Sequence, residues 1–425
     1  MPDADPNPAL GSGVAPALGA LRSDGTRPRN IVVCCDGTAN EVATDATNVV
    51  KLFRALEKGS PRQACFYHPG VGTMAPPGFV TGAGAAVARV AGLAFGYGLT
   101  ADLRDAYAYI ANTYRPGDRL FLFGFSRGAY TVRALASMLH LYGLIERGNE
   151  PLVPYIVRML WAVHALDRKR APGSPPGPRL ASYFSQAARF KATFSSVCQP
   201  HFVGVWDTVS SVGWFTSPVS LPFTASNPDI AIGRHAVAID EHRAFFRSNL
   251  WRPAADPAER GPRDLRQVWF PGAHCDVGGG YPERESGLSK IALGWMMDEA
   301  RSAGLLLDDA AAALVMGAGA SGVSGAGCYA RPDPDAMLHD SLTRWWRLAE
   351  WLPRPRWDAR TGQRVWRANR FKRRELPAGA VVHDAAWTRG GGYAARLPAG
   401  VVQLSQARWP VPEPAGGMTV ASGGS

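Results

Sequence analysis

The sequence predicts an α/β fold, in which a mostly parallel sheet is covered by helices on both faces. Two observations lead to this fold class. The strand-like runs have continuous apolar stretches without regular polar alternation, and segments with helical spacing separate them along the chain. A strand without polar alternation is typical of a parallel sheet buried on both sides. With 425 residues, the chain is long enough for one large domain or two.

The predicted elements alternate in chain order. We expect strands over residues 30–37, 64–70, 119–126, 201–208 and 266–274. We expect helices over 47–58, 100–114, 128–143, 289–304 and 339–352, with less regular helical spacing over 151–193. The sequence therefore predicts a helical insertion, at about 147–195, between the helix after the third strand and the fourth strand.

Composition and charge divide the chain into four parts. Residues 1–28 have no basic start and no sustained apolar core, so we interpret them as a disordered lead and not as a signal peptide. The α/β domain is expected over 29–305, a C-terminal extension packed on it over 306–410, and a disordered tail over 411–425. The longest uncharged stretch, 69–88, is too rich in Gly and Pro for a membrane helix. We therefore expect the chain to be cytoplasmic in the cell that makes it.

The overall composition is that of a soluble globular protein, with 46% hydrophobic and 19% charged residues. Arg greatly outnumbers Lys, which favours GC-rich coding and a bacterial source. None of the six cysteines forms a CxxC pair, so neither a disulfide scaffold nor a zinc site is predicted. We expect no metal and no organic cofactor.

The third strand runs into the pentapeptide Gly-Phe-Ser-Arg-Gly, residues 124–128, which matches G-x-S-x-G. A turn this sharp between a strand and a helix needs glycines two residues before and two residues after the serine. Such a turn exposes the hydroxyl above the sheet and aims the first N–H groups of the helix at an oxyanion. The context predicts Ser126 as a nucleophile on an α/β-hydrolase fold.

A serine nucleophile needs a base, and the base needs a carboxylate. His274 stands at the end of the last predicted strand and precedes the glycine-rich run Cys-Asp-Val-Gly-Gly-Gly-Tyr. Asp207 ends the fourth strand, and Asp240 is the alternative acid, although its surroundings also fit a helix. Strand-end position and the order Ser126, Asp207, His274 favour Asp207, because α/β-hydrolases follow this order.

The oxyanion hole needs two backbone N–H donors. Arg127 follows the nucleophile directly and is expected to supply one of them. The second donor comes from the loop after an early strand in this fold, which here is the loop containing Gly37 and Thr38.

Several longer motifs follow one another in the order, and near the spacing, of a known family. They are CCDGT, GFSRGAY, VWDTVSSVG, VWFPGAHCDVGGGY and LHDSL, within residues 29–400. On these motifs the chain resembles an uncharacterised α/β-hydrolase family that includes the type VI secretion phospholipase effectors of the first lipase class. The resemblance implies a triad at Ser126, Asp207 and His274, an acyl ester or phospholipid substrate, and delivery by type VI secretion.

Residues 342–375 are basic and rich in tryptophan. They hold eleven of the basic residues against three acids, and five of the thirteen Trp. Arg with Trp suits an anionic membrane surface, and nucleic acid is the less favoured partner because no recognised motif accompanies the segment. A solvated face whose tryptophans pack on the core is the alternative, and for a charge run it is favoured over either partner.

Two functions therefore stay open at the level of sequence. The first is a serine esterase or lipase that cleaves acyl esters, with lipids or phospholipids as the expected substrates, Ser126 as the attacking group and His274 as the group that moves the proton. In that case the Gly- and Ala-rich stretch 71–98 is a candidate movable cover. The second is a non-catalytic binding module on the same fold that uses residues 342–375. The sequence does not indicate an oligomeric state.

Overall fold

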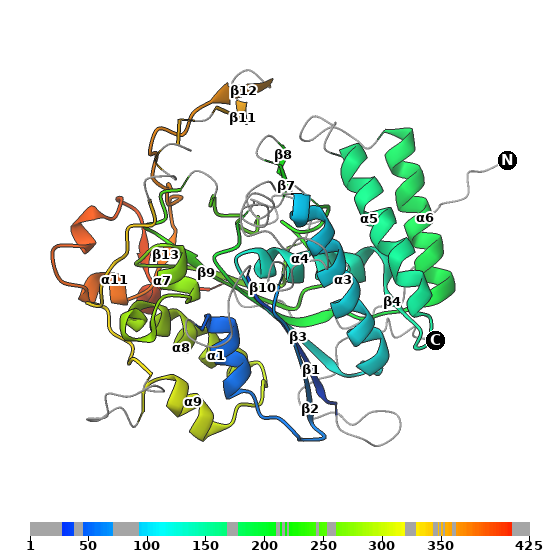
Figure 1. Cartoon of the computed structure of the whole chain (residues 1–425), viewed down its shortest axis with the longest axis horizontal. Helices are drawn as coiled ribbons and strands as arrows, with labels where there is room; N and C mark the ends of the chain where they lie inside the picture. Colours follow the sequence, from blue (N-terminus) through cyan, green and yellow to red (C-terminus); the bar gives the residue numbers. More distant parts are fainter. Residues whose placement is uncertain are drawn as a thin grey trace, which may run out of the picture.

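A parallel sheet of eight strands forms the centre of the molecule, in the order β14-β13-β10-β9-β6-β3-β1-β2 (Figure 1). All seven neighbouring pairs run parallel. The strands are β1 (Asn30–Cys35), β2 (Gln63–His68), β3 (Arg119–Phe125), β6 (Pro200–Trp206), β9 (Ile232–Ala238), β10 (Asp264–Phe270), β13 (Val381–Val382) and β14 (Val402–Gln403).

The computed structural model describes most of the chain outside its two ends. It describes residues 28–37, 46–70, 93–167, 177–209, 213–214, 217–218, 221–243, 246–252, 261–318, 329–342, 347, 350–351, 353–358 and 363–409. The predicted lead up to residue 27, the tail 411–425 and most of the predicted cover, 71–92, lie outside these residues.

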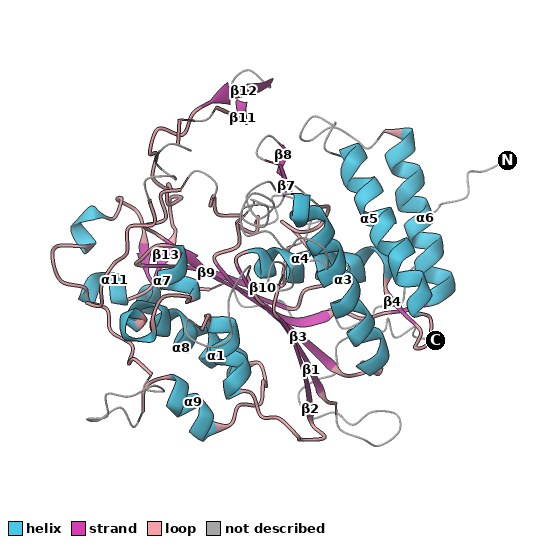
Figure 2. Ribbon diagram, in the orientation of Figure 1, coloured by secondary structure: helices cyan, strands magenta, loops and turns pink. Residues whose placement is uncertain are grey.

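Helices cover both faces of the sheet (Figure 2). They are α1 (Asn48–Ala55), α3 (Leu93–Thr113), α4 (Arg127–Tyr142), α5 (Val153–Asp167), α6 (Pro178–Phe194), α7 (His274–Gly278), α8 (Gly287–Ser302), α9 (Asp309–Val315) and α11 (Ala385–Thr388). Helices α3 to α6 pack on one face, and α1, α8 and α9 on the other. The fold is an α/β fold of the predicted class.

Strand β1 shows why the predicted strands lack polar alternation. Ile31, Val33 and Cys35 point into the core under α3 and α4, whereas Val32 and Cys34 point into the core under α1 and α8. Because successive side chains of a strand point to opposite faces, a strand covered on both sides must be apolar at every position.

The side of the sheet on which successive strands are added changes between β1 and β3. Strand β2 lies on one side of β1, and every later strand of the sheet lies on the other side, starting with β3. In open α/β sheets, binding sites lie beyond the carboxyl ends of the strands at such a point. The end of β3, where Ser126 lies, is therefore the expected place for a site.

A helical insertion lies between α4 and β6. It consists of α5 and α6, which pack on each other and on α4 (Figure 1). Two short strands, β4 (Leu144–Ile145) and β5 (Ser195–Ser196), pair where the insertion leaves and rejoins the sheet domain. Two further pairs stand outside the main sheet: β7 (Gly213–Trp214) with β8 (Ser217–Pro218), and β11 (Arg354–Asp358) with β12 (Gln363–Arg367).

The structure departs from the sequence prediction at β9, which we did not predict as a strand. Its apolar run is interrupted by Arg234 and His235, and both side chains are buried and paired. Arg234 binds Asp264 at 2.6 Å, and His235 lies 3.3 Å from Gln267 Oε1. When buried polar residues have hydrogen-bond partners within the fold, the strand that carries them lacks a continuous apolar run and is missed by a prediction based on hydrophobicity.

The helix predicted over 339–352 is absent from residues 339–342, which have no regular structure. His339 and Ser341 bind Asp276 and Glu241 instead of continuing a helix. Of the rest of this range, the structure describes only residues 347, 350 and 351.

Candidate active site

Ser126 lies in the sharp turn between β3 and α4, with the positive φ of 58° that a nucleophile elbow requires. The two glycines have a steric reason. A Cβ on Gly124 would lie 2.4 Å from the carbonyl oxygen of Gly128, and one on Gly128 would lie 2.1 Å from that of Cys35. The G-x-S-x-G pattern therefore lets β1, β3 and α4 approach one another closely beneath the serine.

His274 is the first residue of α7, directly beyond β10. Its Nε2 lies 2.8 Å from Ser126 Oγ. The imidazole is buried between two aromatic rings, those of Phe125 at 4.6 Å and Phe246 at 4.9 Å between centroids. This packing fixes the ring, so that one nitrogen faces the serine.

Asp207 follows β6 directly, and its backbone also has a positive φ, of 36°. Its Oδ2 lies 2.5 Å from His274 Nδ1. Its Oδ1 accepts a hydrogen bond from the backbone N–H of Ala238 at 3.0 Å. The structure thus brings Ser126, His274 and Asp207 into one hydrogen-bonded chain at the carboxyl ends of β3, β10 and β6.

Burial and charge set the protonation of this chain. Burial lowers the pKa of His274, although the hydrogen bond and charge of Asp207 act in the opposite direction. Burial alone would raise the pKa of Asp207, but Arg374 and His274 outweigh it and hold that pKa well below its usual range. The pair therefore consists of an ionised carboxylate and an imidazole that favours its neutral form.

Arg374 is the residue at this site that the sequence analysis missed. It contacts the carboxylate of Asp207 through both terminal nitrogens. In sequence it is one of eleven basic residues in the segment 342–375, and no motif distinguishes it from the others. No signal in a single sequence would have separated this buried arginine from its exposed neighbours.

The alternative acid, Asp240, has other partners. Its Oδ2 accepts hydrogen bonds from the N–H of Gly272 at 2.8 Å and from the hydroxyl of Tyr393 at 2.6 Å. Asp240 thereby ties the loop between β10 and α7 to the C-terminal region, and it is Asp207 that contacts the imidazole.

Two further carboxylates hold α7 in place. Asp276 accepts a hydrogen bond from the N–H of Ala273 at 2.9 Å and binds His339 Nδ1 at 2.6 Å. Glu241 lies 3.3 Å from the N–H of His274 and accepts the hydroxyl of Ser341 at 2.9 Å. Both contacts to α7 are thus supported by residues 339–341.

The expected oxyanion donors lie around the elbow. Arg127 is the first residue of α4, so its N–H lies at the positive end of the helix, next to Ser126. Gly128 packs against the carbonyl oxygens of Cys35 and Asp36, which brings the loop after β1 to the serine. In this structure the N–H of Gly37 donates to Asp36 Oδ1 at 2.7 Å, and Thr38 lies outside the described residues.

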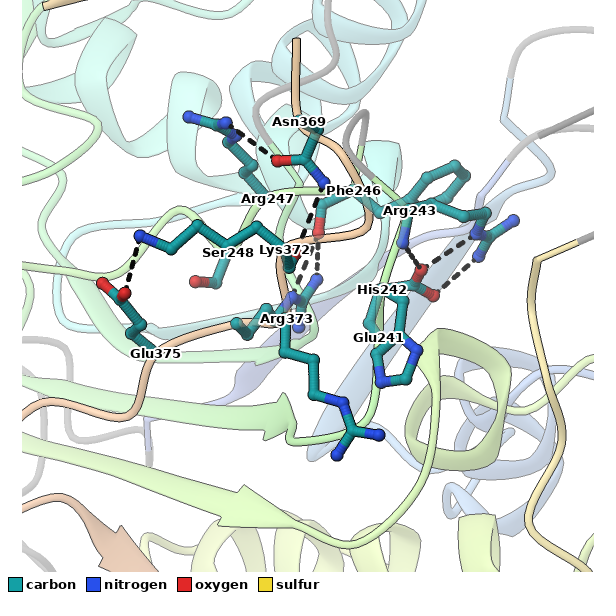
Figure 3. A pocket seen from close by; sticks show the side chains of 11 residues that line it. Glu241, His242, Arg243, Phe246, Arg247, Ser248, Asn369, Lys372, Arg373 and Glu375 are labelled. Atoms are coloured by element: carbon teal, nitrogen blue, oxygen red, sulfur yellow. Dashed lines mark hydrogen bonds and ion pairs between the residues drawn. The ribbon is translucent and has the colours of Figure 1, made fainter. Parts of the chain in front are cut away.

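A cavity of about 290 Å³ lies on the Asp207 side of the site, lined mainly by charged side chains (Figure 3). Many of its cations are paired, as Lys372 is with Glu375 at 2.6 Å and Arg243 with Glu241 at 2.9 Å. Phe246 and Arg374 line it too and contact His274 and Asp207 respectively. The cavity therefore adjoins the Asp207–His274 pair, whose own side chains stay buried behind Arg374 and Phe246.

The segment 342–375 is only partly described. Within it, the side chains of Trp351 and Trp366 are each 58% exposed and that of Phe371 is 40% exposed. Trp351 and Trp366 thus do not pack into the core, unlike Trp206, Trp251 and Trp269, which are buried.

Among the described residues there is neither a cluster of metal ligands nor a helix suited to cross a membrane. They contain no cluster of three or more His, Cys, Asp or Glu side chains arranged to hold a metal ion. No helix among them combines the length and the apolar character that a membrane crossing needs.

Comparison with known proteins places the site in a family. An uncharacterised protein of Saccharomyces cerevisiae, YEL023C, is 33% identical over 233 residues, which are 53% of this chain and 33% of the yeast protein. The chain thus spans about a third of the length of that curated relative.

Two solved structures are more distant. A protein of uncharacterised function from Pseudomonas aeruginosa is 21% identical, with a TM-score of 0.39, over 66% of this chain and 47% of its own. The Tle1 effector, solved bound to the VgrG spike of the type 6 secretion system, is 16% identical, with a TM-score of 0.32, over 62% and 53%.

A family model also matches the chain, and it is described as the type VI secretion phospholipase effector Tle1-like catalytic domain. It matches residues 29–299, which is more than half of the chain and includes β1 to β10 with the Ser126, Asp207 and His274 positions. The chain therefore belongs to the family of Tle1-like phospholipase effector catalytic domains.

Proposed function

We propose that this chain is a serine hydrolase that cleaves acyl esters of lipids, phospholipids among them, through Ser126, His274 and Asp207. One observation carries the proposal: Ser126 Oγ, His274 and Asp207 form a continuous hydrogen-bonded chain, with contacts of 2.8 Å and 2.5 Å. Membership of a phospholipase effector family supports a lipid as the substrate.

The geometry supports the usual steps of a serine hydrolase. Neutral His274 takes the proton of Ser126 through Nε2 while the serine oxygen attacks the ester carbonyl. Asp207 holds the proton on Nδ1 and stabilises the imidazolium that forms. His274 then returns its proton to the departing alcohol, and a water molecule releases the acyl group by the same route.

The developing oxyanion needs preorganised donors. We propose the N–H of Arg127 as one donor and an N–H of the loop after β1 as the second. The N–H of Gly37 can serve only after its hydrogen bond to Asp36 Oδ1 has been exchanged for the oxyanion. That exchange would accompany a movement of this loop on substrate binding.

The experiment replaces the nucleophile. We expect Ser126→Ala to lower phospholipid hydrolysis on the order of 10⁴-fold or more and to abolish labelling by a fluorophosphonate probe. Ser302→Ala is the matched control, because Ser302 is an exposed serine on α8 that bonds only within its helix. A folded Ser126→Ala protein that hydrolyses phospholipid at the wild-type rate would show the proposal to be wrong.

We also propose that residues 342–375 contact an anionic lipid surface, as the exposure of Trp351, Trp366 and Phe371 favours. We expect the protein to sediment with vesicles of phosphatidylglycerol and less with vesicles of phosphatidylcholine. Replacing Trp351 and Trp366 by Ala should weaken this binding without changing the hydrolysis of a soluble ester. Equal binding to both kinds of vesicle would exclude an anionic surface as the partner.

Delivery by type VI secretion remains a proposal that follows from the family alone.

A further inference from the structure

Arg374 reaches the site from outside the part of the chain that matches the family. The matched residues end at 299, whereas Arg374 follows the β11–β12 pair in the C-terminal region. Its Nη1 lies 2.5 Å from Asp207 Oδ1, and its Nη2 lies 3.0 Å from Oδ2. The side chain of Arg374 is only 6% exposed, and that of Asp207 is fully buried.

The guanidinium is itself fixed by backbone oxygens. Nη1 donates to the carbonyl of Ala238 at 2.9 Å, Nε donates to that of Phe246 at 3.1 Å, and Nη2 also donates to the carbonyl of Phe246. A planar fork with donors in several directions is a property of arginine that lysine does not share. Arg374 thus joins the ends of β6 and β9 to the loop whose Phe246 packs on His274.

The contact completes the coordination of the carboxylate. Oδ1 accepts from Ala238 N–H and Arg374, while Oδ2 accepts from His274 and Arg374. A buried carboxylate paired only with a neutral imidazole would be an uncompensated charge, which is costly in a protein interior. The arginine supplies the missing positive charge without occupying the oxygen lone pair that faces Nδ1.

We propose that Arg374 is a positioning residue for the reaction: it locks the carboxylate that orients His274 and neutralises that carboxylate's buried charge. This inference rests on the proposed function, because it assigns Arg374 its role through Asp207 and His274. It also means that the C-terminal region contributes a group to the active site that the family-matched residues lack.

The other charges around the pair do not substitute for Arg374. The titratable and charged groups that face Asp207 and His274 from the surrounding elements are Arg374, Arg243, Glu241, His235 and Cys275. Burial lowers the pKa of His235 to about 3 and raises that of Cys275 to about 12, so both are neutral near pH 7. Arg243 is paired with Glu241, which leaves Arg374 as the cation bound to Asp207 among the described residues.

Removing the guanidinium has a predictable sign. Without it, the full negative charge of Asp207 acts on the imidazole and favours the imidazolium. The pKa of His274 in the free enzyme therefore rises, and the acidic limb of the kcat/KM profile moves to higher pH. Arg374 carries a unit charge that lies a few ångströms further from the imidazole than Asp207 does. At the effective dielectric of a protein site, removing such a charge moves the midpoint of the acidic limb by about one pH unit.

The test compares Arg374→Met and Arg374→Lys with Arg189→Met, a change at an exposed arginine of α6, and with Ser126→Ala. For Arg374→Met we expect kcat to fall roughly 10- to 100-fold, because the His–Asp geometry loosens, and the acidic limb to move up. Arg374→Lys keeps the positive charge but loses the planar guanidinium that binds both carboxylate oxygens. We therefore expect kcat to fall while the acidic limb of the kcat/KM profile stays in place. Arg189→Met should match the wild type in both kcat and the position of the acidic limb. In Arg374→Ala, millimolar guanidinium, which can enter through the adjoining cavity, should restore part of kcat.

Three results would separate the positioning role of Arg374 from a structural role and from the proposed function. If Arg374→Met is folded by circular dichroism and has a wild-type kcat, or a lowered kcat with an unmoved acidic limb and no rescue by guanidinium, the positioning role is wrong. If Arg374→Met and Arg374→Lys both fail to fold, the contact is structural and the inference is also overturned. The proposed function fails separately, since active Ser126→Ala would refute the nucleophile whatever the arginine variants do.

Discussion

At the scale of the residue, His274 determines how the activity should depend on pH. Burial lowers the pKa of His274, with Arg243 acting in the same direction and Asp207 and Glu241 opposing. The base is active only when neutral, so kcat/KM falls as the pH drops through this pKa. Because the pKa lies below the ordinary value of 6.5, activity should persist to a lower pH than an ordinary histidine would allow.

The measurement is a pH–rate profile of kcat/KM on a soluble ester, with a substrate that does not itself titrate. We expect a single acidic limb with its midpoint below 6.5, the ordinary value for histidine. A midpoint above that value would mean that Asp207 dominates over burial, and the electrostatic description given for the site would be wrong.

The three polar residues could be found in the sequence because each stands at a strand end with a local signal. Ser126 lies between two sterically required glycines, and Asp207 and His274 each end an apolar run. Arg374 could not be found, because its role depends on where a long connection brings it in space. Nor could the hydrogen bond from Gly37 N–H to Asp36, because it depends on the rotamer of one side chain.

At the scale of the element, the short helix α7 carries His274 and depends on residues 339–341 for its position. His339 binds Asp276 at 2.6 Å and Glu285 at 3.2 Å, and its ring stacks on Tyr281 at 3.7 Å between centroids. A five-residue helix has little stability of its own, so such contacts decide its orientation.

His339→Ala removes the side-chain partner of the buried Asp276 carboxylate. An unsatisfied buried acceptor costs about 1–3 kcal/mol, so we expect a lower midpoint of thermal unfolding. We also expect kcat to fall, because α7 and its His274 lose a fixed position. His242→Ala is the control, since His242 lines the charged cavity and has no hydrogen-bond partner among the described residues. Unfolding and kcat equal to the wild type in His339→Ala would show that α7 is held without this contact.

The elements differ in how far the sequence reveals them. Strands β1, β3 and β6 each contain a continuous apolar run, and β10 ends in the apolar residues Val268, Trp269 and Phe270, so their presence could be predicted to within a few residues. Strand β9 was hidden by Arg234 and His235, which the fold satisfies internally with Glu299, Asp264 and Gln267. Residues 339–342 have helical spacing, but tertiary hydrogen bonds to Asp276 and Glu241 override it.

At the scale of the whole molecule, the C-terminal region is built into the sheet. Strand β13 pairs with β10 through Val381 and Val382, and β14 pairs with β13. Around this edge a small core forms from Val237, Trp269, Val382, Ala386 and Tyr393. Two-residue strands carry no recognisable pattern, so their place in the sheet could not be predicted. The division at about residue 305 into a catalytic domain and an extension remains a proposal, and we propose that the two fold as one unit.

A chain ending at residue 305 tests whether the catalytic domain and the C-terminal extension fold as one unit. It retains the family-matched residues and the pairing of β10 with β9, but it removes β13 from the other side of β10 and uncovers Trp269, which is buried against the C-terminal region. It also loses Arg374, His339 and Ser341, which hold Asp207, Asp276 and Glu241. An unpaired strand edge beside an exposed apolar surface favours aggregation. We therefore expect poor solubility, no cooperative thermal unfolding and no labelling of Ser126 by a fluorophosphonate. A chain ending at Trp409 retains all the described strands and should label as the full chain does. If the chain ending at residue 305 were soluble and hydrolysed esters at the full rate, the matched residues would suffice for catalysis, and the C-terminal contacts to the three carboxylates would be dispensable.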